Sequence, residues 1–449
     1  MTDIISFQQA RLARDARFDG QFFVAVKSTG IFCRPICPAN PPKEQNVEYY
    51  PLAELAMQAG YRPCLRCRPD SAPYSCAWKG VDTTVERALT LLAEFPELSL
   101  EQISSKLGIS DRYLRKLFKQ KVGIGAKQYQ LCQQMLFAKK LLHETSLNIE
   151  QVAAASGFQS SRRLQDNLKK TLQLTPKQIR SSKHIQHKSL RLSLSFRPPY
   201  NWPQLRDFLA MRAVPDMEWV SEDSYARTFS LDGVGGYFCA RYQHDSHQFL
   251  VELDLQNLSI LKPVLAQIRR ILDLDADSHL IERHFEDLGM PRQDIVSGLR
   301  LPGVWSPFEA GCRAILGQQI SVTAAIKLLS KLVHQLGSEQ DGRYSFPPPQ
   351  AVMQSDLTFL GMPNARRETL RRLAEYQLED PTDELQNWLK IKGIGPWTVD
   401  YARMRGQSNP DIWLGTDLVI KKRLAQLQLD PQLAAPWRSY LTFQLWSRT

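Results

Sequence analysis

The sequence predicts a multidomain protein that is mainly α-helical with α+β parts. Three observations support this prediction. The 449-residue chain is long enough for about three domains. Its first 75 or so residues concentrate cysteine, proline and glycine, which indicates a short, loop-rich module. The remainder shows two helical regions, separated by a region in which apolar and polar residues alternate as in strands.

Two closely spaced cysteine pairs mark the first module. Cys33-Arg-Pro-Ile-Cys37 and Cys64-Leu-Arg-Cys67 are separated by a short stretch rich in loop-forming residues. Four such thiols can converge on one tetrahedral zinc ion, which would stabilise a module too small to rely on an apolar core. The pattern therefore predicts a zinc ligand set of Cys33, Cys37, Cys64 and Cys67. Most four-cysteine sites are structural, so a purely structural zinc is the alternative to a reactive one.

The next region, from Thr83 to about Ile179, has apolar residues at helical intervals and contains the same pattern twice. Residues 98–118 and 147–168 each read as a helix, a glycine-containing turn and a second helix that begins with polar and basic residues. This is the layout of a helix-turn-helix. Two copies in one segment predict an all-α double helix-turn-helix domain.

After a polar, basic linker at 181–188, the pattern changes to that of a small α+β domain. Alternation predicts strands at 190–196, 225–231 and 249–255. From about Pro302 the chain is helical again to its end, interrupted by three prolines at 347–349. We therefore expect four domains, listed here in chain order: a small zinc domain at 1–78, the double helix-turn-helix at 83–183, an α+β domain at 188–300 and an all-α domain at 301–449.

Charge and composition favour an anionic partner and exclude a membrane span. The net charge is +11, and residues 81–187 alone carry 17 Lys and Arg against 9 Asp and Glu. A basic excess of this kind favours nucleic acid. No apolar run approaches the ~20 residues of a membrane span, and the N-terminus lacks the pattern of a secretory signal. We expect a cytoplasmic protein whose thiols remain reduced, which favours metal binding over disulfides.

The C-terminal region contains a third motif. Leu389-Lys-Ile-Lys-Gly-Ile-Gly-Pro-Trp-Thr398 reads as a helix-hairpin-helix. The glycines Gly393 and Gly395 would let the hairpin backbone approach a DNA phosphate, with a monovalent cation as a candidate ligand of the same backbone. Asp417 follows twenty residues after Trp397. From the sequence alone, a helix N-cap is the favoured explanation of Asp417, with Thr416 as a competing cap residue.

The cysteine motifs resemble a known family. Gly30-Ile-Phe-Cys-Arg-Pro-Ile-Cys37 and Ala59-Gly-Tyr-Arg-Pro-Cys-Leu-Arg-Cys-Arg-Pro-Asp70 are similar to the N-terminal domain of the Ada methylphosphotriester-repair proteins. The resemblance implies that Cys33 accepts a methyl group from an alkylated DNA phosphate. The chemistry is reasonable, because a zinc-bound thiolate is a nucleophile at neutral pH.

The segment 83–183 resembles the DNA-binding domain of AraC-type regulators over its whole length, including Gly157-Phe158 and Thr175-Pro176. The resemblance implies recognition helices at 110–119 and 160–170. Four arginines are then candidates for contacts with bases or phosphates: Arg112, Arg115, Arg162 and Arg163. A domain that binds DNA without sequence preference is the alternative.

From about Leu190 to Ser447 the chain resembles the AlkA DNA-3-methyladenine glycosylases. The likeness rests on Leu301-Pro-Gly303, on the run 308–318, and on the hairpin followed by Asp417. It implies that Asp417 is the catalytic carboxylate, which stabilises an oxocarbenium-like sugar. It also implies that the damaged base is flipped into a pocket of electron-rich rings, formed by Trp397, Tyr401 and Trp446.

The resemblance further implies hydrolysis without backbone cleavage. Relatives that also cut the strand carry a lysine where Trp397 stands, and without that amine no Schiff base forms there. This sequence departs from the AlkA pattern twice: Leu418 replaces an aromatic residue beside the aspartate, and Gln319 replaces an apolar wedge. It also lacks the Pro-Cys-His-Arg motif of the second Ada repair domain, so we expect no repair of alkylated guanine oxygen.

Together these patterns predict a monofunctional glycosylase of alkylated bases that is fused to a methylphosphotriester-sensing transcriptional activator. The expected partners are alkylated and promoter double-stranded DNA and RNA polymerase, and we expect a monomer. One rival is a DNA-binding regulator with structural zinc and a catalytically dead glycosylase-like domain. A second rival is a glycosylase whose N-terminal half only delivers it to DNA.

Overall fold

The computed structural model describes residues 2–15, 18–67, 69, 85, 88–89, 91–92, 98–180, 190–379, 385–427 and 429–447. It divides into two compact units, Met1–Arg197 with Ser246–Ala266, and Pro198–Asp245 with Gln267–Thr449. The expected fold class is confirmed: the described residues form a module with a four-cysteine cluster, a helical region with paired helices, a mainly antiparallel sheet and a second helical region. The expected linker at 181–188 lies outside the described residues.

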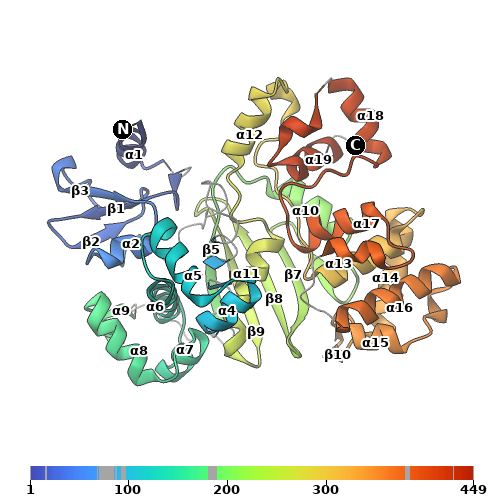
Figure 1. Cartoon of the computed structure of the whole chain (residues 1–449), viewed down its shortest axis with the longest axis horizontal. Coiled ribbons are helices and arrows are strands. Elements are labelled where there is room, and N and C mark those ends of the chain that lie inside the picture. Colours follow the sequence, from blue (N-terminus) through green and yellow to red (C-terminus); the bar gives the residue numbers. More distant parts are fainter. Residues whose placement is uncertain are drawn as a thin grey trace. The chain divides into compact units, whose positions relative to one another are not determined.

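The N-terminal module is a small four-stranded sheet with short helices (Figure 1). Its elements are α1 Thr2–Leu12, β1 Phe23–Val26, β2 Ile31–Cys33, a 3-10 turn Glu44–Asn46, β3 Val47–Tyr50, α2 Ala53–Gln58 and β4 Arg62–Pro63. The strand order is β3-β1-β2-β4, and only the β2–β4 pair is parallel. Its apolar core is small: the ring of Phe22 stacks on that of Phe7 and meets that of Tyr49 edge-on. Such a module needs additional stabilisation, as its sequence predicts.

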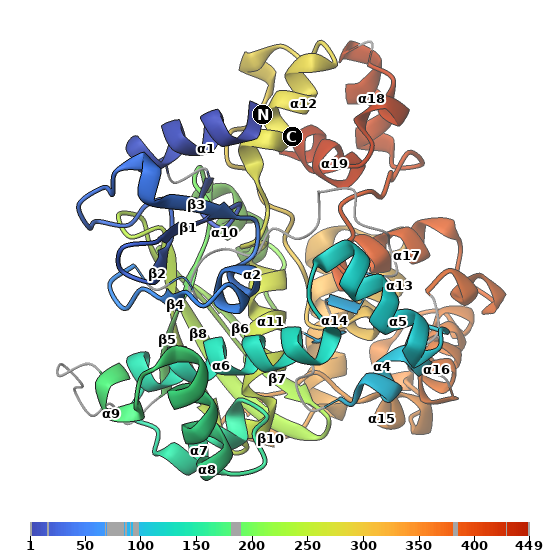
Figure 2. The ribbon, with the colours of Figure 1, turned by 60° about the vertical axis from the view of Figure 1, so that its left-hand side comes forward.

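Two helix pairs joined by one long helix form the next region, as Figure 2 shows in cyan and green. Its elements are α4 Leu100–Lys106, α5 Asp111–Leu117, the π-helical turn Phe118–Val122, α6 Ala126–Glu144, α7 Ile149–Ala155, α8 Ser161–Asn167, the π-helical turn Leu168–Leu172 and α9 Pro176–Ile179. The two copies also match in their helix caps. Ser99 and Asn148 each form a capping box at the start of α4 and α7, and Ser110 and Ser160 cap α5 and α8.

The strand-rich region contains β5 Leu190–Ser195, α10 Trp202–Ala210, β6 Glu218–Val220, β7 Ser224–Leu231, β8 Val234–Gln243, β9 Gln248–Leu255, a 3-10 turn Leu258–Ile260 and α11 Leu261–Ile271. In the first unit β5 pairs antiparallel with β9, and in the second β6, β7 and β8 form antiparallel hairpins. Within the second unit the strand order is β8-β7-β6. The three strands expected from alternation are confirmed. The sequence pattern missed β8, where two adjacent glycines interrupt the alternation.

The C-terminal region is helical, as expected. Its elements are α12 Ser278–Asp287, a 3-10 turn Arg292–Asp294, α13 Pro307–Gly317, α14 Val322–Leu336, β10 Glu339–Gln340, β11 Arg343–Tyr344, α15 Pro349–Gln354, a 3-10 turn Thr358–Leu360, α16 Asn364–Glu379, a 3-10 helix Leu385–Lys390, α17 Pro396–Tyr401, a π-helical turn Ala402–Gly406, α18 Leu418–Leu427, a 3-10 turn Pro431–Ala434 and α19 Arg438–Trp446. Among the described residues, the short hairpin β10–β11 departs from the expected helical pattern. Helices α13 to α17 share an apolar core that includes Leu373 and Trp388.

A buried ionic network joins the sheet to α13 within the second unit. Arg227 on β7 donates to Glu309 on α13 at 3.2 and 2.9 Å, and Arg313 bridges Glu309 and Glu218. Burial raises the pKa of Glu218, but the charges of Arg313 and Arg227 outweigh that effect and lower it to about 2. The network therefore keeps these four groups charged and fixes α13, which carries part of the cavity described below.

Candidate functional site

The parallel pairing of β2 and β4 brings two of the four cysteines together. Cys33 ends β2 and Cys64 follows β4, and the backbone N–H of Cys64 donates to the carbonyl of Phe32 at 2.9 Å. Neighbouring parallel strands end at the same edge of a sheet, so both thiols lie at that edge. The second cysteine of each pair folds back to the same point.

The four Sγ atoms lie within 4.8 Å of one another, which fits a metal site. A tetrahedral zinc with bonds of about 2.3 Å needs sulfurs about 3.8 Å apart. Cys64 and Cys67 are buried, whereas Cys33 and Cys37 are half-buried. The geometry and chemistry of this donor set fit one zinc ion, and the predicted ligand set is confirmed as a cluster.

Arg34, next to Cys33, holds Cys67 of the cluster through hydrogen bonds. Its backbone N–H donates to Cys67 Sγ at 3.3 Å, and its guanidinium donates to the Cys67 carbonyl at 3.3 Å. The guanidinium also forms a buried ion pair with Asp19, with Nε 2.8 Å from Oδ1. Hydrogen bonds of this kind orient metal ligands. Sequence reasoning missed Arg34 and Asp19, since nothing in the cysteine spacing points to them.

The expected recognition helices correspond to α5 and α8. Arg112, Arg115, Arg162 and Arg163 all project from exposed positions on these helices, while Leu114 and Leu164 face the cores. Arg115 forms an i,i+4 ion pair with Asp111 at 2.7 Å, and Arg163 donates to Gln159 at 2.5 Å. Neighbouring Tyr113 is 47% exposed, which is unusual for a large ring and which sequence reasoning missed.

The two hairpin glycines, Gly393 and Gly395, lie in different surroundings. Gly393 adopts φ +99°, and a Cβ atom there would overlap the side chain of Thr369 on α16. The hydroxyl of Thr369 also donates to the carbonyl of Lys392 at 3.3 Å, so the turn lies tightly against α16. Gly395 caps α17, and a Cβ atom there would meet nothing within 4 Å. Its open surroundings leave the start of α17 accessible to an approaching strand.

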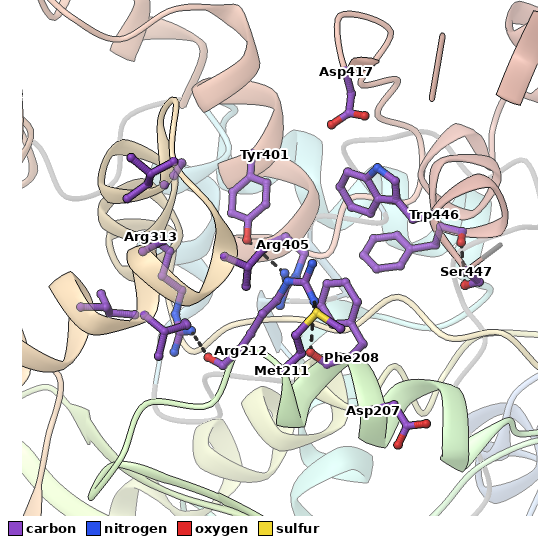
Figure 3. A pocket seen from close by; sticks show the side chains of 18 of the residues that line it. Asp207, Phe208, Met211, Arg212, Arg313, Tyr401, Arg405, Asp417, Trp446 and Ser447 are labelled. Carbon is purple, nitrogen blue, oxygen red and sulfur yellow. Dashed lines mark hydrogen bonds between the residues drawn. The ribbon is translucent and has the colours of Figure 1, made fainter. Parts of the chain in front are cut away.

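A cavity of about 800 Å³ in the second unit is lined by the predicted catalytic carboxylate and the predicted aromatic residues of the base pocket. Asp417, Trp397, Tyr401 and Trp446 all line it. Figure 3 shows Asp417, Tyr401 and Trp446, which come from three different segments of the C-terminal region. Trp397 and Tyr401 lie one helical turn apart on α17, and their rings stack with centroids 5.2 Å apart. Trp446, on α19, meets Phe443 edge-on at 5.1 Å.

Asp417 is both a helix cap and a cavity residue. Its Oδ1 accepts from the backbone N–H of Ile420 at 3.2 Å, at the start of α18. The N-cap interpretation and the catalytic interpretation are therefore compatible: the cap fixes the carboxylate at the wall of the cavity. A carboxylate held in this way can stabilise a positive charge that develops in front of it. The side chain of Leu418, the departure beside Asp417, lies outside the described residues.

Sequence reasoning missed a set of residues on the opposite wall of the cavity. Phe208 and Arg212 come from the region of α10, and Arg405 follows α17. Only their apolar and basic character was visible in the sequence, and their common location depends on tertiary structure. Gln319, the other departure, lies in the turn before α14 with φ +59° and is exposed. Its neighbour Ile320 lines the cavity and is 37% exposed.

Comparison with known proteins accounts for these parts together. Three family models match: the metal binding domain of Ada at residues 6–70, a helix-turn-helix domain at 103–182 and the AlkA N-terminal domain at 191–306. A protein of Mycobacterium tuberculosis named "Probable bifunctional transcriptional activator/DNA repair enzyme AlkA" is 33% identical over 97% of this chain and 94% of its own length. The chain belongs to this family of bifunctional activator and repair proteins.

Two shorter relatives match separate parts of this family member. DNA-3-methyladenine glycosylase 2 of Escherichia coli is 33% identical over 57% of this chain and 96% of its own length. The bifunctional transcriptional activator/DNA repair enzyme Ada of Escherichia coli is 34% identical over 38% of this chain and 48% of its own length. The four-cysteine cluster lies within the Ada match, which supports one zinc ion. Among the described residues, no helix is long and apolar enough to cross a membrane.

Proposed function

We propose that this chain is a monofunctional DNA glycosylase that hydrolyses the bond between deoxyribose and an alkylated base such as 3-methyladenine. The observation that carries the proposal is the cavity that Asp417 shares with Trp397, Tyr401 and Trp446. The flipped base enters this cavity and stacks on the electron-rich rings, which favour a cationic base. The stacked pair of Trp397 and Tyr401 offers such a face.

The reaction follows from what each group can do. As the C1′–N bond breaks, its electron pair passes to the base and the sugar becomes oxocarbenium-like. Asp417 stabilises that positive charge, and the oxygen of a water bonds to C1′ with release of a proton. Among the described residues that line the cavity, none is a lysine, so no amine is in place for a Schiff base. The product is an abasic site in an unbroken strand.

The N-terminal module is proposed as a methylphosphotriester sensor in which Cys33 accepts the methyl group. Bound zinc keeps the four sulfurs as thiolates at neutral pH. Cys33 Sγ attacks the methyl carbon, the carbon–oxygen bond breaks, and the phosphate leaves as an ordinary diester anion. The half-buried position of Cys33 gives the attacking sulfur an approach from solvent. Arg34, braced by Asp19, holds the peptide that follows the nucleophile.

The rest of the chain is proposed to place these two activities on DNA. Helices α5 and α8 present Arg112, Arg115, Arg162 and Arg163 to promoter DNA, and the hairpin at Gly393 and Gly395 holds the phosphate backbone of the damaged duplex, with a monovalent cation as an additional ligand. The methylated protein then recruits RNA polymerase. A cytoplasmic monomer is proposed, with domains at 1–78, 83–183, 188–300 and 301–449.

One experiment tests both activities. An alkylated duplex that carries methylated bases and methylphosphotriesters is incubated with the protein, and base release and the mass of the Cys33 peptide are measured on the same sample. We expect free alkylated base, an intact strand and a Cys33 peptide heavier by one methyl substitution. Absence of base release would reduce the C-terminal half to an inactive scaffold, and an unmodified Cys33 would leave zinc with a structural role only.

A further inference from the structure

Three arginines line the cavity, and they differ in what balances their charge. Arg313 pairs with Glu218 at 2.6 Å and with Glu309 at 2.8 Å. Arg405 is buried and donates to the Tyr401 hydroxyl at 3.1 Å and to backbone carbonyls. Arg212 makes two long hydrogen bonds, to the Phe208 carbonyl at 3.4 Å and to the Met211 sulfur at 3.6 Å. Neither of these neutral acceptors balances a full positive charge.

The Arg212 guanidinium is held against an aromatic ring. Its central carbon lies 3.8 Å from the centroid of Phe208, and the Arg405 guanidinium lies 4.8 Å from the same centroid. Figure 3 shows Arg212, Phe208 and Arg405 gathered below Tyr401, away from Asp417. The Asp417 carboxylate and the Arg212 guanidinium thus lie on different walls of the cavity, and a second carboxylate, Asp207, lines it below Phe208.

Arg212 nevertheless remains charged at neutral pH. Burial, together with the positive charges of Arg405 and Arg313, lowers its pKa to about 10, and Tyr401 opposes that shift. The surroundings thus destabilise the charged form of Arg212 relative to an exposed arginine, but the side chain keeps its proton at neutral pH. A cation of this kind interacts strongly with charge that appears next to it, because little solvent screens the interaction.

We propose that Arg212 binds the acceptor edge of the flipped base and stabilises the electron pair that the base takes up as the glycosidic bond breaks. This inference rests on the proposed function and extends it to the substrate class. The base becomes more negative by one charge during the reaction, whatever its initial charge. Arg212 therefore accelerates the chemical step for every base, by the logic of differential binding.

The initial charge of the base decides a second effect. A cationic base is repelled by Arg212 before its bond breaks, whereas a neutral base presents its carbonyl or ring nitrogen to the guanidinium donors without that repulsion. Arg212 thus broadens the cavity toward neutral damaged purines, which are the harder ones to release because they depart as anions. The aromatic rings therefore favour binding of a cationic base, whereas Arg212 disfavours it.

The test compares two bases within one protein preparation, so that partial unfolding cancels. Duplexes that contain a single hypoxanthine, which is neutral, or a single 7-methylguanine, which is cationic, are used under single-turnover conditions. For Arg212→Met we expect the saturating rate to fall about 10-fold or more on both duplexes. The duplex with hypoxanthine loses its bonds to the guanidinium and should bind about 10-fold more weakly. The duplex with the cationic base should bind as well as before, so kcat/KM for hypoxanthine relative to 7-methylguanine should fall about 10-fold.

Two further variants sharpen the comparison. Arg212→Lys retains the charge and should recover part of the ratio. Arg241→Met removes an exposed arginine of β8 that pairs with Asp223 at 2.7 Å, and neither residue lines the cavity, so this variant should leave the ratio unchanged. An equal loss of kcat/KM on both bases in Arg212→Met, or a wild-type protein that releases only the cationic base, would overturn the inference. Failure of the proposed function would look different, since the wild-type protein would release neither base.

Discussion

At the scale of single residues, Asp417 combines two roles that the sequence presents as alternatives. The same carboxylate caps α18 through the Ile420 N–H and lines the cavity. An N-cap normally needs no conserved chemistry beyond a short polar acceptor, and asparagine serves as well as aspartate. Catalysis by charge stabilisation needs the negative charge. A single substitution can therefore separate the two roles.

We predict that Asp417→Asn retains the fold and loses base release by at least about 10²-fold, the usual scale for removal of a preorganised electrostatic group. The asparagine Oδ1 still accepts from the Ile420 N–H, so the thermal unfolding midpoint should change little. The check is the single-turnover rate on a 3-methyladenine duplex together with a melting curve. The exposed neighbour Thr416 provides the matched control, and Thr416→Ala should keep the wild-type rate. A variant that excises at the wild-type rate would exclude Asp417 as the catalytic group.

The role of a single residue could be predicted where it belongs to a motif of closely spaced residues. The two members of each cysteine pair are separated by only a few residues, and this spacing, visible in the sequence, is typical of metal ligands. Phe208 and Arg212 carry no such signal, since they precede α17 by almost two hundred residues and reach the cavity only through tertiary packing. The partnership of Asp19 with Arg34 was equally invisible for the same reason.

At the scale of elements, the two hairpin glycines should respond differently to the same substitution. Gly393→Ala forces a side chain into φ +99° and into Thr369, so we predict a lower unfolding midpoint together with loss of excision. Gly395→Ala meets open space and should fold normally. Its methyl group stands where a phosphate would approach, so DNA affinity should fall several-fold. Melting curves and duplex binding of both variants provide the measurement, and equal behaviour of the two would contradict the assignment.

The contact between α2 and α6 predicts a pH effect on local stability. Glu54 on α2 is buried and accepts a hydrogen bond from the Gln133 side chain on α6. Burial raises the pKa of Glu54 from 4.5 to about 7. The unfolded chain releases this proton at lower pH than the folded one. The contact is therefore most stable below pH 4.5, weakens as pH rises toward about 7 and stays constant above it. The full effect amounts to at most about 3 kcal/mol, at about 1.4 kcal/mol per pKa unit.

Glu54→Gln removes this ionisation and should flatten the pH dependence. We expect protection of α2 and α6 amides to fall from about pH 5.5 to about pH 8 in the wild-type protein and to stay level in the variant, after correction for intrinsic exchange rates. Hydrogen exchange of the full chain provides the measurement. Glu101→Gln, on the exposed first turn of α4, should behave like the wild type. A variant whose protection is lower by the same factor at every pH would point to packing rather than to charge.

The elements themselves were predictable to different degrees. A long periodic helix such as α14 follows directly from its apolar spacing. Strands of two or three residues such as β2 and β4 have too few positions to show alternation, so the parallel pair that positions Cys33 beside Cys64 could not be foreseen. The glycine-containing turn and the polar and basic residues that begin the second helix occur in both copies, which is why the double motif was recognisable in the sequence.

At the scale of the whole molecule, the two proposed activities use different groups and should be separable. Asp417 lies in the second unit and Cys33 in the first. Asp417→Asn should therefore leave the extent of Cys33 methylation unchanged. Cys33→Ala should abolish methyl transfer and leave base release on a duplex without phosphotriesters close to the wild-type rate. Parallel measurement of both products in both variants would show whether either activity depends on the other.

Methylation of Cys33 should itself change how the molecule binds DNA. Four thiolates on one zinc ion carry a net charge of about −2, and methylation of one sulfur reduces it to about −1. The module approaches a polyanion, so repulsion falls and the affinity of the methylated protein should rise several-fold at low salt. The gain should shrink as added salt screens the charge, because the effect is electrostatic. Affinities of the methylated and unmethylated proteins for one duplex, measured at two salt concentrations, provide the check. Asp417→Asn should show the same gain, since its substitution lies in the other unit. A gain that is absent, or equally large at both salt concentrations, would mean that methylation acts through a change of shape rather than through charge.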